Sequence, residues 1–299
     1  MHKQFDFRAG FNAALLLAAV MSCVPGSAFA AAADTAKETE FTPVVGQEGK
    51  DVIWVPTPDK TVEKMLTVAN VGPKDFVIDL GSGDGRIVVN AAKLGARAFG
   101  VDMNPKMVKL SEDRAAKEGV TERAKFYVRD IFETDLRPAT VVTMYLLPQL
   151  NMRLRPSILN LKPGTRIVSH AFDMGDWEPD VYDTSTGNSV RMWVVPAKVS
   201  GAWQWQTKSG AGEKPVVLEL DQKFQHVSGN FKSAGSKMSL RDAKLQGDEI
   251  SFTVIEENGS GTIRHDYSGH VNGNTIDGAV KSSNSQAASK WSATRKSAG

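Results

Sequence analysis

Cysteine is almost absent from the sequence, since Cys23 is the only one among 299 residues. A single thiol excludes an intramolecular disulfide framework and any zinc site that needs several thiolate ligands, and we expect no metal site. Charge of one sign is also lacking, because 36 lysines and arginines nearly balance 34 aspartates and glutamates. A protein devoted to nucleic acid usually carries a basic surface, so no nucleic-acid partner is expected. With 41% apolar residues, a chain of this length is expected to form two domains with packed cores.

The first thirty residues have the pattern of a secretory signal peptide. In order, this segment contains Lys3, Arg8, the apolar run 13–24, Pro25-Gly26 and the small-x-small triplet Ala28-Phe29-Ala30. This order predicts export to the periplasm or secretion, with cleavage after Ala30. A mainly apolar run of twelve residues is too short to cross a hydrocarbon core of ~30 Å, so no membrane span is expected after cleavage. The longer uncharged stretch 9–33 makes an uncleaved N-terminal anchor the alternative.

Two regions of the remaining chain have different patterns. Between residues 51 and 198, short β-rich runs alternate with helical stretches. From residue 199 to residue 299 the helical periodicity is absent, and turn signals recur about every ten residues. Residues 31–50 follow neither period, which is typical of a flexible leader. We therefore predict an α/β domain over 51–198 and a small antiparallel β-barrel or meander domain over 199–299.

The 51–198 region is predicted to form a doubly wound, mostly parallel, Rossmann-like sheet. Strands are expected at 76–80, 98–102, 125–128, 140–145 and 166–169, and helices at 86–94, 105–117 and 149–161. The first strand is a continuous apolar run broken only by Asp79, as expected of a strand buried on both faces. A further helix, capped by Asp59, is expected to precede it and to end before Gly72-Pro73. In such a sheet, ligands bind at the carboxyl ends of the strands.

The loop after the first strand is the most informative segment. It reads Asp79-Leu80-Gly81-Ser82-Gly83-Asp84-Gly85-Arg86, and Asp102 ends the next strand. Glycines allow the backbone to approach a ligand closely, and a carboxylate at a strand end can accept hydrogen bonds from both ribose hydroxyls. A dinucleotide loop would have a third glycine in place of Arg86, and the Gly-Lys-Ser/Thr ending of a P-loop is absent. Asp79 would repel a pyrophosphate but could pair with an ammonium group, so a nucleoside that carries an amino acid is predicted.

At these residues the sequence resembles the class I S-adenosylmethionine-dependent methyltransferases. More narrowly, it is similar to the lysine methyltransferases that modify the c-subunit of ATP synthase and the adenine nucleotide translocase, and to their bacterial relatives. The narrower resemblance depends on Trp54-Val55-Pro56-Thr57-Pro58, on the loop 79–87 and on the segment 172–179. It implies S-adenosylmethionine as cofactor and protein-lysine N-methyltransferase activity.

The resemblance also implies a role for each matching residue. Asp79, Gly81 and Gly83, with Ser82 in the same loop, would hold the methionine moiety. Asp102 would hold the ribose, and Asp130 with Ile131 would flank the adenine. The segment 54–58 is either a rigid lead-in that packs on the sheet or a segment that closes over the cofactor.

The acceptor side of the site is less defined by the sequence. Tyr145, at the end of the fourth predicted strand, is a candidate catalytic residue, and an aromatic wall of the pocket is the alternative. We interpret His170 as a hydrogen-bonded structural residue rather than a base. Phe172, Met174 and Trp177 either surround the alkyl stem of a substrate or pack over the sheet. The Asp/Asn-Pro-Pro-aromatic sequence of enzymes that methylate amide or base nitrogens is missing, which disfavours a DNA-base or glutamine substrate.

The 199–299 region is predicted to be an antiparallel meander that closes into a small barrel. Trp203 and Trp205 open it and Trp291 nearly ends it, so its first and last strands are expected to pair. Asn272-Gly273 and Gln246-Gly247-Asp248 predict tight turns. The region is either a module for ligand or substrate binding or a stable appendage with tryptophans in its core.

Three functions are consistent with these features. The first is an exported methyltransferase that acts on lysine in a protein. The second is an exported, non-catalytic module that binds a nucleoside or another ligand and recognises a partner through its barrel. It is considered because S-adenosylmethionine is made in the cytoplasm, so an exported enzyme would need a supply of it. The third is a methyltransferase with a small-molecule acceptor.

Overall fold

The computed structural model describes residues 41–47, 53–209, 212–259 and 261–296. The predicted signal peptide, Cys23 and most of the predicted leader lie outside these residues. Within the described residues, no helix combines the length and the apolar character needed to cross a membrane. Residues 41–299 form one compact unit that contains two separate β-sheets.

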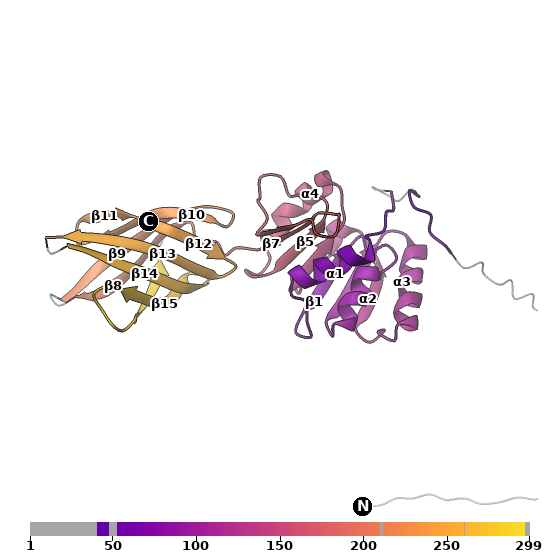
Figure 1. Cartoon of the computed structure of the whole chain (residues 1–299), viewed down its shortest axis with the longest axis horizontal. Helices are drawn as coiled ribbons and strands as arrows, with labels where there is room; N and C mark the ends of the chain where they lie inside the picture. Colours follow the sequence, from indigo (N-terminus) through magenta and orange to yellow (C-terminus); the bar gives the residue numbers. More distant parts are fainter. Residues whose placement is uncertain (1–40, 48–52, 210–211, 260, 297–299) are drawn as a thin grey trace, which may run out of the picture. The chain divides into compact units, whose positions relative to one another are not determined.

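The first sheet has seven strands in the order β3-β2-β1-β4-β5-β7-β6 (Figure 1). Its strands are β1 (Phe76–Leu80), β2 (Arg97–Asp102), β3 (Ala124–Val128), β4 (Val141–Met144), β5 (Arg166–His170), β6 (Val181–Asp183) and β7 (Val190–Val194). The helices are α1 (Asp59–Val68), α2 (Arg86–Lys93), α3 (Pro105–Lys117) and α4 (Pro148–Ile158), with a 3₁₀ turn, η1 (Ile131–Glu133). Strands β1 to β5 are parallel, and β7 runs antiparallel to both β5 and β6. The predicted Rossmann-like, mostly parallel sheet is confirmed.

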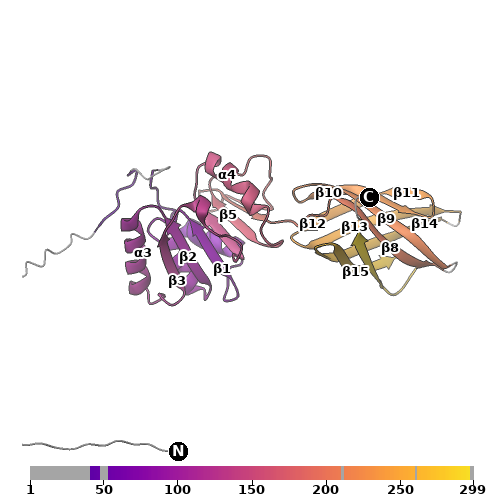
Figure 2. The same ribbon diagram turned by 180° about the vertical axis from the view of Figure 1, so that it is seen from behind.

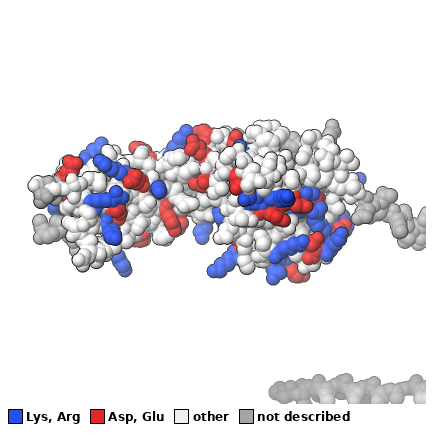
Figure 3. Space-filling view, viewed as in Figure 1, with Lys and Arg blue, Asp and Glu red and all other residues white. Residues whose placement is uncertain are grey.

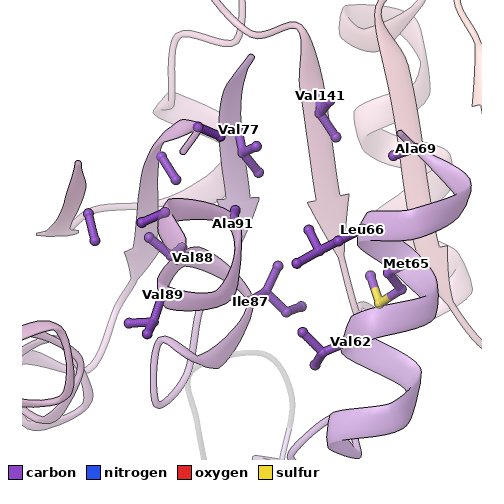
Figure 4. Packing of buried hydrophobic residues seen from close by; sticks show 14 of the residues in the cluster. Val62, Met65, Leu66, Ala69, Val77, Ile87, Val88, Val89, Ala91 and Val141 are labelled. Atoms are coloured by element: carbon purple, nitrogen blue, oxygen red, sulfur yellow. The ribbon is translucent and has the colours of Figure 1, made fainter. Parts of the chain in front are cut away.

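The sheet is covered on both faces by apolar side chains. Successive residues of β1 alternate between the two cores, since Val77 packs with α1, α2 and α3 whereas Ile78 packs with α4. Figure 4 shows the first core, in which side chains of α1 and α2 lie against Val77 and Val141 of the sheet. This double coverage explains why the predicted strands are continuous apolar runs.

Two local expectations need correction. Asp59 does not cap α1, because Pro58 is the N-cap residue and Asp59 is the first helical residue, with its carboxylate 3.5 Å from the guanidinium of Arg86. A carboxylate in the first turn still interacts favourably with the helix dipole. Helix α4 ends at Ile158 rather than at residue 161, because the N–H groups of Asn160 and Leu161 donate three residues back, to Ser157 O and Ile158 O, and no longer follow the α-helical pattern.

The order of the strands creates a crevice between β1 and β4. The chain moves outward from β1 to β2 and β3, and then returns to pair β4 with the other side of β1. At such a reversal the connections after the two neighbouring strands diverge, which leaves space at their carboxyl ends. The glycine loop follows β1 and Tyr145 follows β4, so this crevice receives both.

The second sheet has nine strands, each paired with antiparallel neighbours (Figure 2). They are β8 (Gly201–Ser209), β9 (Gly212–Lys223), β10 (His226–Ser233), β11 (Ser236–Ser239), β12 (Arg241–Gln246), β13 (Glu249–Asn258), β14 (Gly261–Asn272), β15 (Thr275–Ser282) and β16 (Ser289–Arg295). The first and last strands pair, as predicted, through Trp203 with Arg295 and Gln204 with Thr294. Gly247 and Gly273 adopt positive φ in the two predicted turns.

Aromatic side chains fill the interior of the second sheet. Trp205, Phe231, Phe252, Tyr267 and Trp291 contact one another with ring centroids 4.9 to 6.1 Å apart. Trp203, Trp205 and Trp291 are all buried, which agrees with their interpretation as core residues. On the face of the molecule drawn in Figure 3, basic and acidic side chains are interspersed, in keeping with the balanced composition.

Candidate active site

A cavity of about 330 Å³ lies at the carboxyl ends of β1, β2 and β4. Its lining includes every site residue predicted from the sequence: Asp79, Gly81, Ser82, Gly83, Asp102, Asp130, Ile131 and Tyr145. These residues come from four different strand ends, up to 66 positions apart in the chain. The fold therefore brings these residues together around one cavity.

The glycine loop is bound to the end of β2 by its backbone. Gly81 N and Ser82 N both donate to Val101 O, at 3.0 and 2.9 Å, and Gly83 N donates to Asp102 Oδ2 at 3.0 Å. Gly83 has a φ of 53°, and a Cβ atom there would lie 2.7 Å from Trp54 Nε1. A side chain at this position would meet both a backbone penalty and a clash, so only glycine fits.

Asp79 is a buried carboxylate at the entrance of this loop. Its Oδ1 accepts a hydrogen bond of 2.7 Å from the Thr143 hydroxyl. The pKa of Asp79 is raised to about 7: burial is the largest cause, the hydrogen bond from Thr143 opposes the rise, and the nearby Asp102 and Asp84 add to it. A cationic group in the cavity would favour the ionised carboxylate, so Asp79 is suited to an ammonium ligand.

Asp102 ends β2 with both carboxylate oxygens directed to backbone donors. Oδ2 accepts from Gly83 N and Oδ1 accepts from Asn104 N at 2.8 Å. Burial raises the pKa of Asp102, and its backbone hydrogen bonds oppose the rise. Each oxygen retains a further lone pair, so the carboxylate can also accept hydrogen bonds from a pair of ligand hydroxyls.

Asp130 follows β3 and caps the 3₁₀ turn η1. Its Oδ1 accepts from Phe132 N at 2.9 Å, and the Thr134 hydroxyl donates to its carbonyl oxygen at 2.8 Å. This local cap places Asp130 and the next residue, Ile131, together on the cavity wall.

Asp84 belongs to an ion-pair cluster that sequence reasoning missed. Its Oδ2 lies 2.7 Å from Arg86 Nη2 and 2.8 Å from Arg114 Nη2, while Arg86 Nη1 donates to Thr57 O at 2.8 Å. The cluster connects the glycine loop to α3 and to the segment 54–58. Arg114 is 30 positions from Asp84 in the sequence, so no local signal could have identified this pair.

The segment 54–58 lies beside the cavity. Trp54, Val55, Pro56 and Thr57 contribute to its wall, and Arg86 holds the segment by the carbonyl of Thr57. Both predicted roles, packing and closure over the cofactor, are compatible with this place.

Gly100 of β2 is a second residue that sequence reasoning missed. A Cβ atom at Gly100 would lie 2.4 Å from Ser82 Cβ and 2.6 Å from Ser82 Oγ. The glycine therefore creates the space in which Ser82 packs, although its φ is not unusual. Ser82 Oγ is buried and has no hydrogen-bond partner within the described part of the chain. Such an atom is costly unless a ligand or water satisfies it.

Aromatic residues form the wall next to β4 and β5. The ring centroid of Tyr145 lies 3.9 Å from that of His170. It lies 5.9 Å from that of Phe172, and these two rings are stacked. His170 is buried behind Tyr145, its Nδ1 is 3.1 Å from the Thr57 hydroxyl, and burial lowers its pKa. His170 is thus held by a hydrogen bond in the interior, as its structural interpretation requires.

Of the three predicted collar residues, only Phe172 lines the cavity. Met174 and Trp177 are fully buried in the core of the seven-stranded sheet. The collar hypothesis is therefore wrong for these two residues, because the chain turns into the core directly after Phe172.

The chain matches the family model of the ANTKMT methyltransferase domain over residues 79–181. A protein-lysine N-methyltransferase of Saccharolobus islandicus is 42% identical over 151 residues, which cover 48% of this chain and 94% of that relative. The Mus musculus lysine N-methyltransferase named for the c-subunit of ATP synthase is 32% identical over 188 residues, or 62% of this chain and 70% of the relative.

Among solved structures, an RNA methyltransferase of Salinibacter ruber in complex with S-adenosyl-L-homocysteine is 46% identical, with a TM-score of 0.47. The match covers 48% of this chain and 96% of that one. The region that the family model matches, residues 79–181, contains the glycine loop, β2, η1 and Tyr145, whose residues line the cavity. The chain belongs to the S-adenosylmethionine-dependent methyltransferase family to which the Saccharolobus and mouse enzymes belong.

Proposed function

We propose that this methyltransferase transfers the methyl group of S-adenosylmethionine to the ε-amino nitrogen of a lysine in a protein acceptor. The observation that carries the proposal is the 42% identity to a protein-lysine N-methyltransferase over nearly the whole length of that relative. The relatives named for the c-subunit of ATP synthase and for the adenine nucleotide translocase support the same class of acceptor.

The residues around the cavity fit the methyl donor. The buried Asp79 matches its ammonium group, Asp102 its ribose hydroxyls, and Asp130 with Ile131 its adenine, while the loop 81–83 leaves room for the methionine part. When bound, the donor would supply a methyl group on a positively charged sulfur, and the sulfur would be the leaving group when a nucleophile attacks the methyl carbon in line. The work of the protein is then mainly to align the two groups and to exclude water.

The acceptor nitrogen must be unprotonated to react. For a lysine with a reference pKa of ~10.4, neutralisation at pH 7 costs roughly 4.6 kcal/mol. The wall formed by Tyr145, Leu147 and Phe172 is aromatic and apolar, so it would desolvate an entering ammonium group and lower its pKa. We assign to Tyr145 the orientation of the amine, whereas the buried His170 supports the ring of Tyr145 from behind.

The test is to incubate the purified protein with S-adenosylmethionine carrying a labelled methyl group and with a bacterial protein extract. We expect label in protein, recovered as methyllysine after acid hydrolysis, and no transfer when the lysines of the extract have first been chemically acetylated, because the resulting amide nitrogen is not a nucleophile. Asp79→Ala should abolish the labelling. Label confined to RNA or to small molecules would overturn the proposed acceptor.

Export of the mature enzyme is a second proposal, supported by the order of charged, apolar and small residues in the first thirty positions. N-terminal sequencing of the protein from fractionated cells should begin at Ala31 in the periplasmic or secreted fraction. A chain that begins at Met1 in the cytoplasmic fraction would overturn it.

A further inference from the structure

A hairpin of the second sheet contacts the loop that carries Phe172 to the cavity. The hairpin joins β9 to β10, with Lys223 and His226 paired and Phe224 and Gln225 at its tip. The loop, residues 171–180, follows β5 of the first sheet. All of these residues belong to the unit 41–299.

The two residues of the hairpin tip bind Trp177 and its neighbour. The ring of Phe224 stacks on Trp177 with centroids 5.8 Å apart and planes at 20°. Trp177 Nε1 donates to Gln225 Oε1 at 3.0 Å, and Gln225 Nε2 donates to Glu178 O at 2.7 Å. Gln225 thus uses both ends of its amide on the loop, which is a specific arrangement rather than a general apolar contact.

The backbone of Phe224 is strained in this position. Its φ is 53°, a left-handed conformation that is uncommon for a bulky residue and that glycine or asparagine would adopt more easily. Strain of this kind persists where surrounding contacts determine it, and it is concentrated at functional segments. The two-residue turn between Lys223 and His226 imposes this φ, as the equivalent turn does at Ala234. At this tip the Phe224 ring contacts Trp177 and lies 5.4 Å from the guanidinium of Arg155.

The other end of the loop is held by the first sheet. Ala171 also has a positive φ, of 64°; its N–H donates to Ser189 O at 2.7 Å, and its carbonyl accepts from Arg191 Nη1. Phe172 comes next and lies on the cavity wall. Its position is therefore set between Ala171, which is held by β7, and Trp177, which is held both by Trp193 of β7 and by the hairpin.

Helix α4 connects these two ends. Asn151 Nδ2 donates to Asp173 O at 3.0 Å, and Arg155 Nη1 donates to Met174 O at 2.8 Å. The carboxylate of Asp176 lies 2.6 Å from Arg155 and 3.2 Å from Lys223 of the hairpin strand. The first sheet also holds the far end of the loop, since Trp193 Nε1 donates to Trp177 O at 2.8 Å. Removal of the hairpin contact would therefore free the Trp177 side chain on the side that faces the second sheet.

We propose that Phe224 and Gln225 are positioning residues of the methyltransferase, through which the nine-stranded sheet fixes the acceptor side of the active site. This inference rests on the proposed function for its effect on transfer to lysine. The Saccharolobus relative is covered to 94% by 151 aligned residues, so it is too short to contain a counterpart of the nine-stranded sheet. The device therefore belongs to this chain and not to the methyltransferase fold in general.

The test compares Phe224→Gly and Gln225→Ala with the unaltered full-length protein. When the three proteins are saturated with S-adenosylhomocysteine, deuterium exchange in residues 171–180 should be faster in both variants, because the hairpin contact with Trp177 is lost; kcat/KM is measured separately, without added S-adenosylhomocysteine. The value of kcat/KM for the protein acceptor should fall on the order of 10-fold to 100-fold, as misplacement of a wall by about 1 Å would cause. The affinity for S-adenosylhomocysteine should stay unchanged, because Asp79 and Asp102 are not touched.

Two further variants make the test specific. Phe224→Tyr keeps the stacked ring and should behave as the unaltered protein. Ala234→Gly is the matched control, since Ala234 also has a positive φ, of 49°, at the tip of another hairpin, but it is exposed and without an aromatic ring. It should change neither the exchange of 171–180 nor kcat/KM.

Unchanged exchange of residues 171–180 in both Phe224→Gly and Gln225→Ala would overturn the inference. A loss of cofactor affinity equal to the loss of kcat/KM would overturn it as well, because it would indicate general destabilisation. If the unaltered protein transfers no methyl group to protein, the proposed function fails, while the exchange measurement still decides whether the hairpin fixes the loop.

Discussion

The two sheets of this chain use buried positions in opposite ways. In the first region, buried polar side chains are concentrated around the strand ends and the loops that follow them, and they include two carboxylates, Asp79 and Asp84. In the described part of the second region, the buried side chains are aliphatic or aromatic apart from that of Thr253, which donates to Asp266 at 2.7 Å. Burial of a carboxylate lowers stability unless a partner compensates it. The buried residues of the first region therefore serve ligand binding at a cost in stability, whereas those of the second region serve packing.

The largest expected effect concerns the core of the second sheet. Trp205→Ala removes a buried ring that contacts Phe231, Tyr267 and Trp291, and it should lower the free energy of unfolding of this sheet by about 3–5 kcal/mol. Chemical denaturation followed by tryptophan fluorescence measures the loss. Calorimetry with S-adenosylhomocysteine should find no change in affinity, and a weakened affinity would contradict the division of roles between the sheets.

Asp79→Ala is expected to have the opposite profile. Removal of the carboxylate should weaken S-adenosylhomocysteine binding by about 100-fold or more, the usual cost of truncating one partner of a buried charged pair. The fold should stay intact, because the free protein no longer buries an acid. Calorimetry and circular dichroism test both statements, with Asp277→Ala on the second sheet as control. Equal affinity in the two variants would mean that Asp79 does not bind the ligand.

Gly100→Ala should affect both stability and binding. The new methyl group would lie within 2.4 Å of Ser82 Cβ, so the glycine loop must move, at a cost of about 1–3 kcal/mol in unfolding free energy. Gly278→Ala is the matched change in the second sheet, where the added atom would clash with Ser268 O. Both variants should melt at lower temperature, but only Gly100→Ala should weaken S-adenosylhomocysteine binding. If both variants bind S-adenosylhomocysteine equally well, the position of Ser82 does not matter for binding of this ligand.

The smallest expected effect is the pH dependence of the affinity for S-adenosylhomocysteine. Because the pKa of Asp79 is raised to about 7 in the free protein, an ammonium ligand must displace a proton below that pH. The affinity for S-adenosylhomocysteine should rise with pH up to about 7, by at most tenfold per unit, and then level off. Asp79→Asn should bind weakly with a flat profile between pH 6 and 8. A flat profile in the unaltered protein would contradict the assignment.

The raised pKa of Asp79 also makes the stability of the ligand-free protein depend on pH. The folded, ligand-free protein retains the Asp79 proton at pH values where the unfolded chain, with a pKa near 3.8, has lost it. The contribution of Asp79 to the unfolding free energy therefore declines as pH rises from about 4 to about 7. Thermal unfolding of Asp79→Asn should lack this decline, and a parallel decline in both proteins would assign it to another group.

Residues close together in the sequence were the predictable part of the site. The strand 76–80, the glycine loop and the helix over Pro105–Lys117 follow from apolar pattern, glycine spacing and an Asn-Pro helix start, and the structure has them at those positions. Strands β6 and β7 were not predicted from the sequence, because strands of three and five residues at a sheet edge give only a short pattern. The capping role of Asp59 was wrong for a local reason, since proline already sets the backbone at the N-cap.

By itself, the sequence determined the glycine loop, the acids at the strand ends and the aromatic content of the second sheet, because turn geometry and apolar periodicity are properties of short segments. Only the tertiary structure decided that Arg114 neutralises Asp84, that Gly100 makes room for Ser82, and that Trp177 meets Phe224 rather than the cavity. These pairs join residues 18 to 47 positions apart. Their contact depends on how whole elements pack, and packing has no signature within either segment alone.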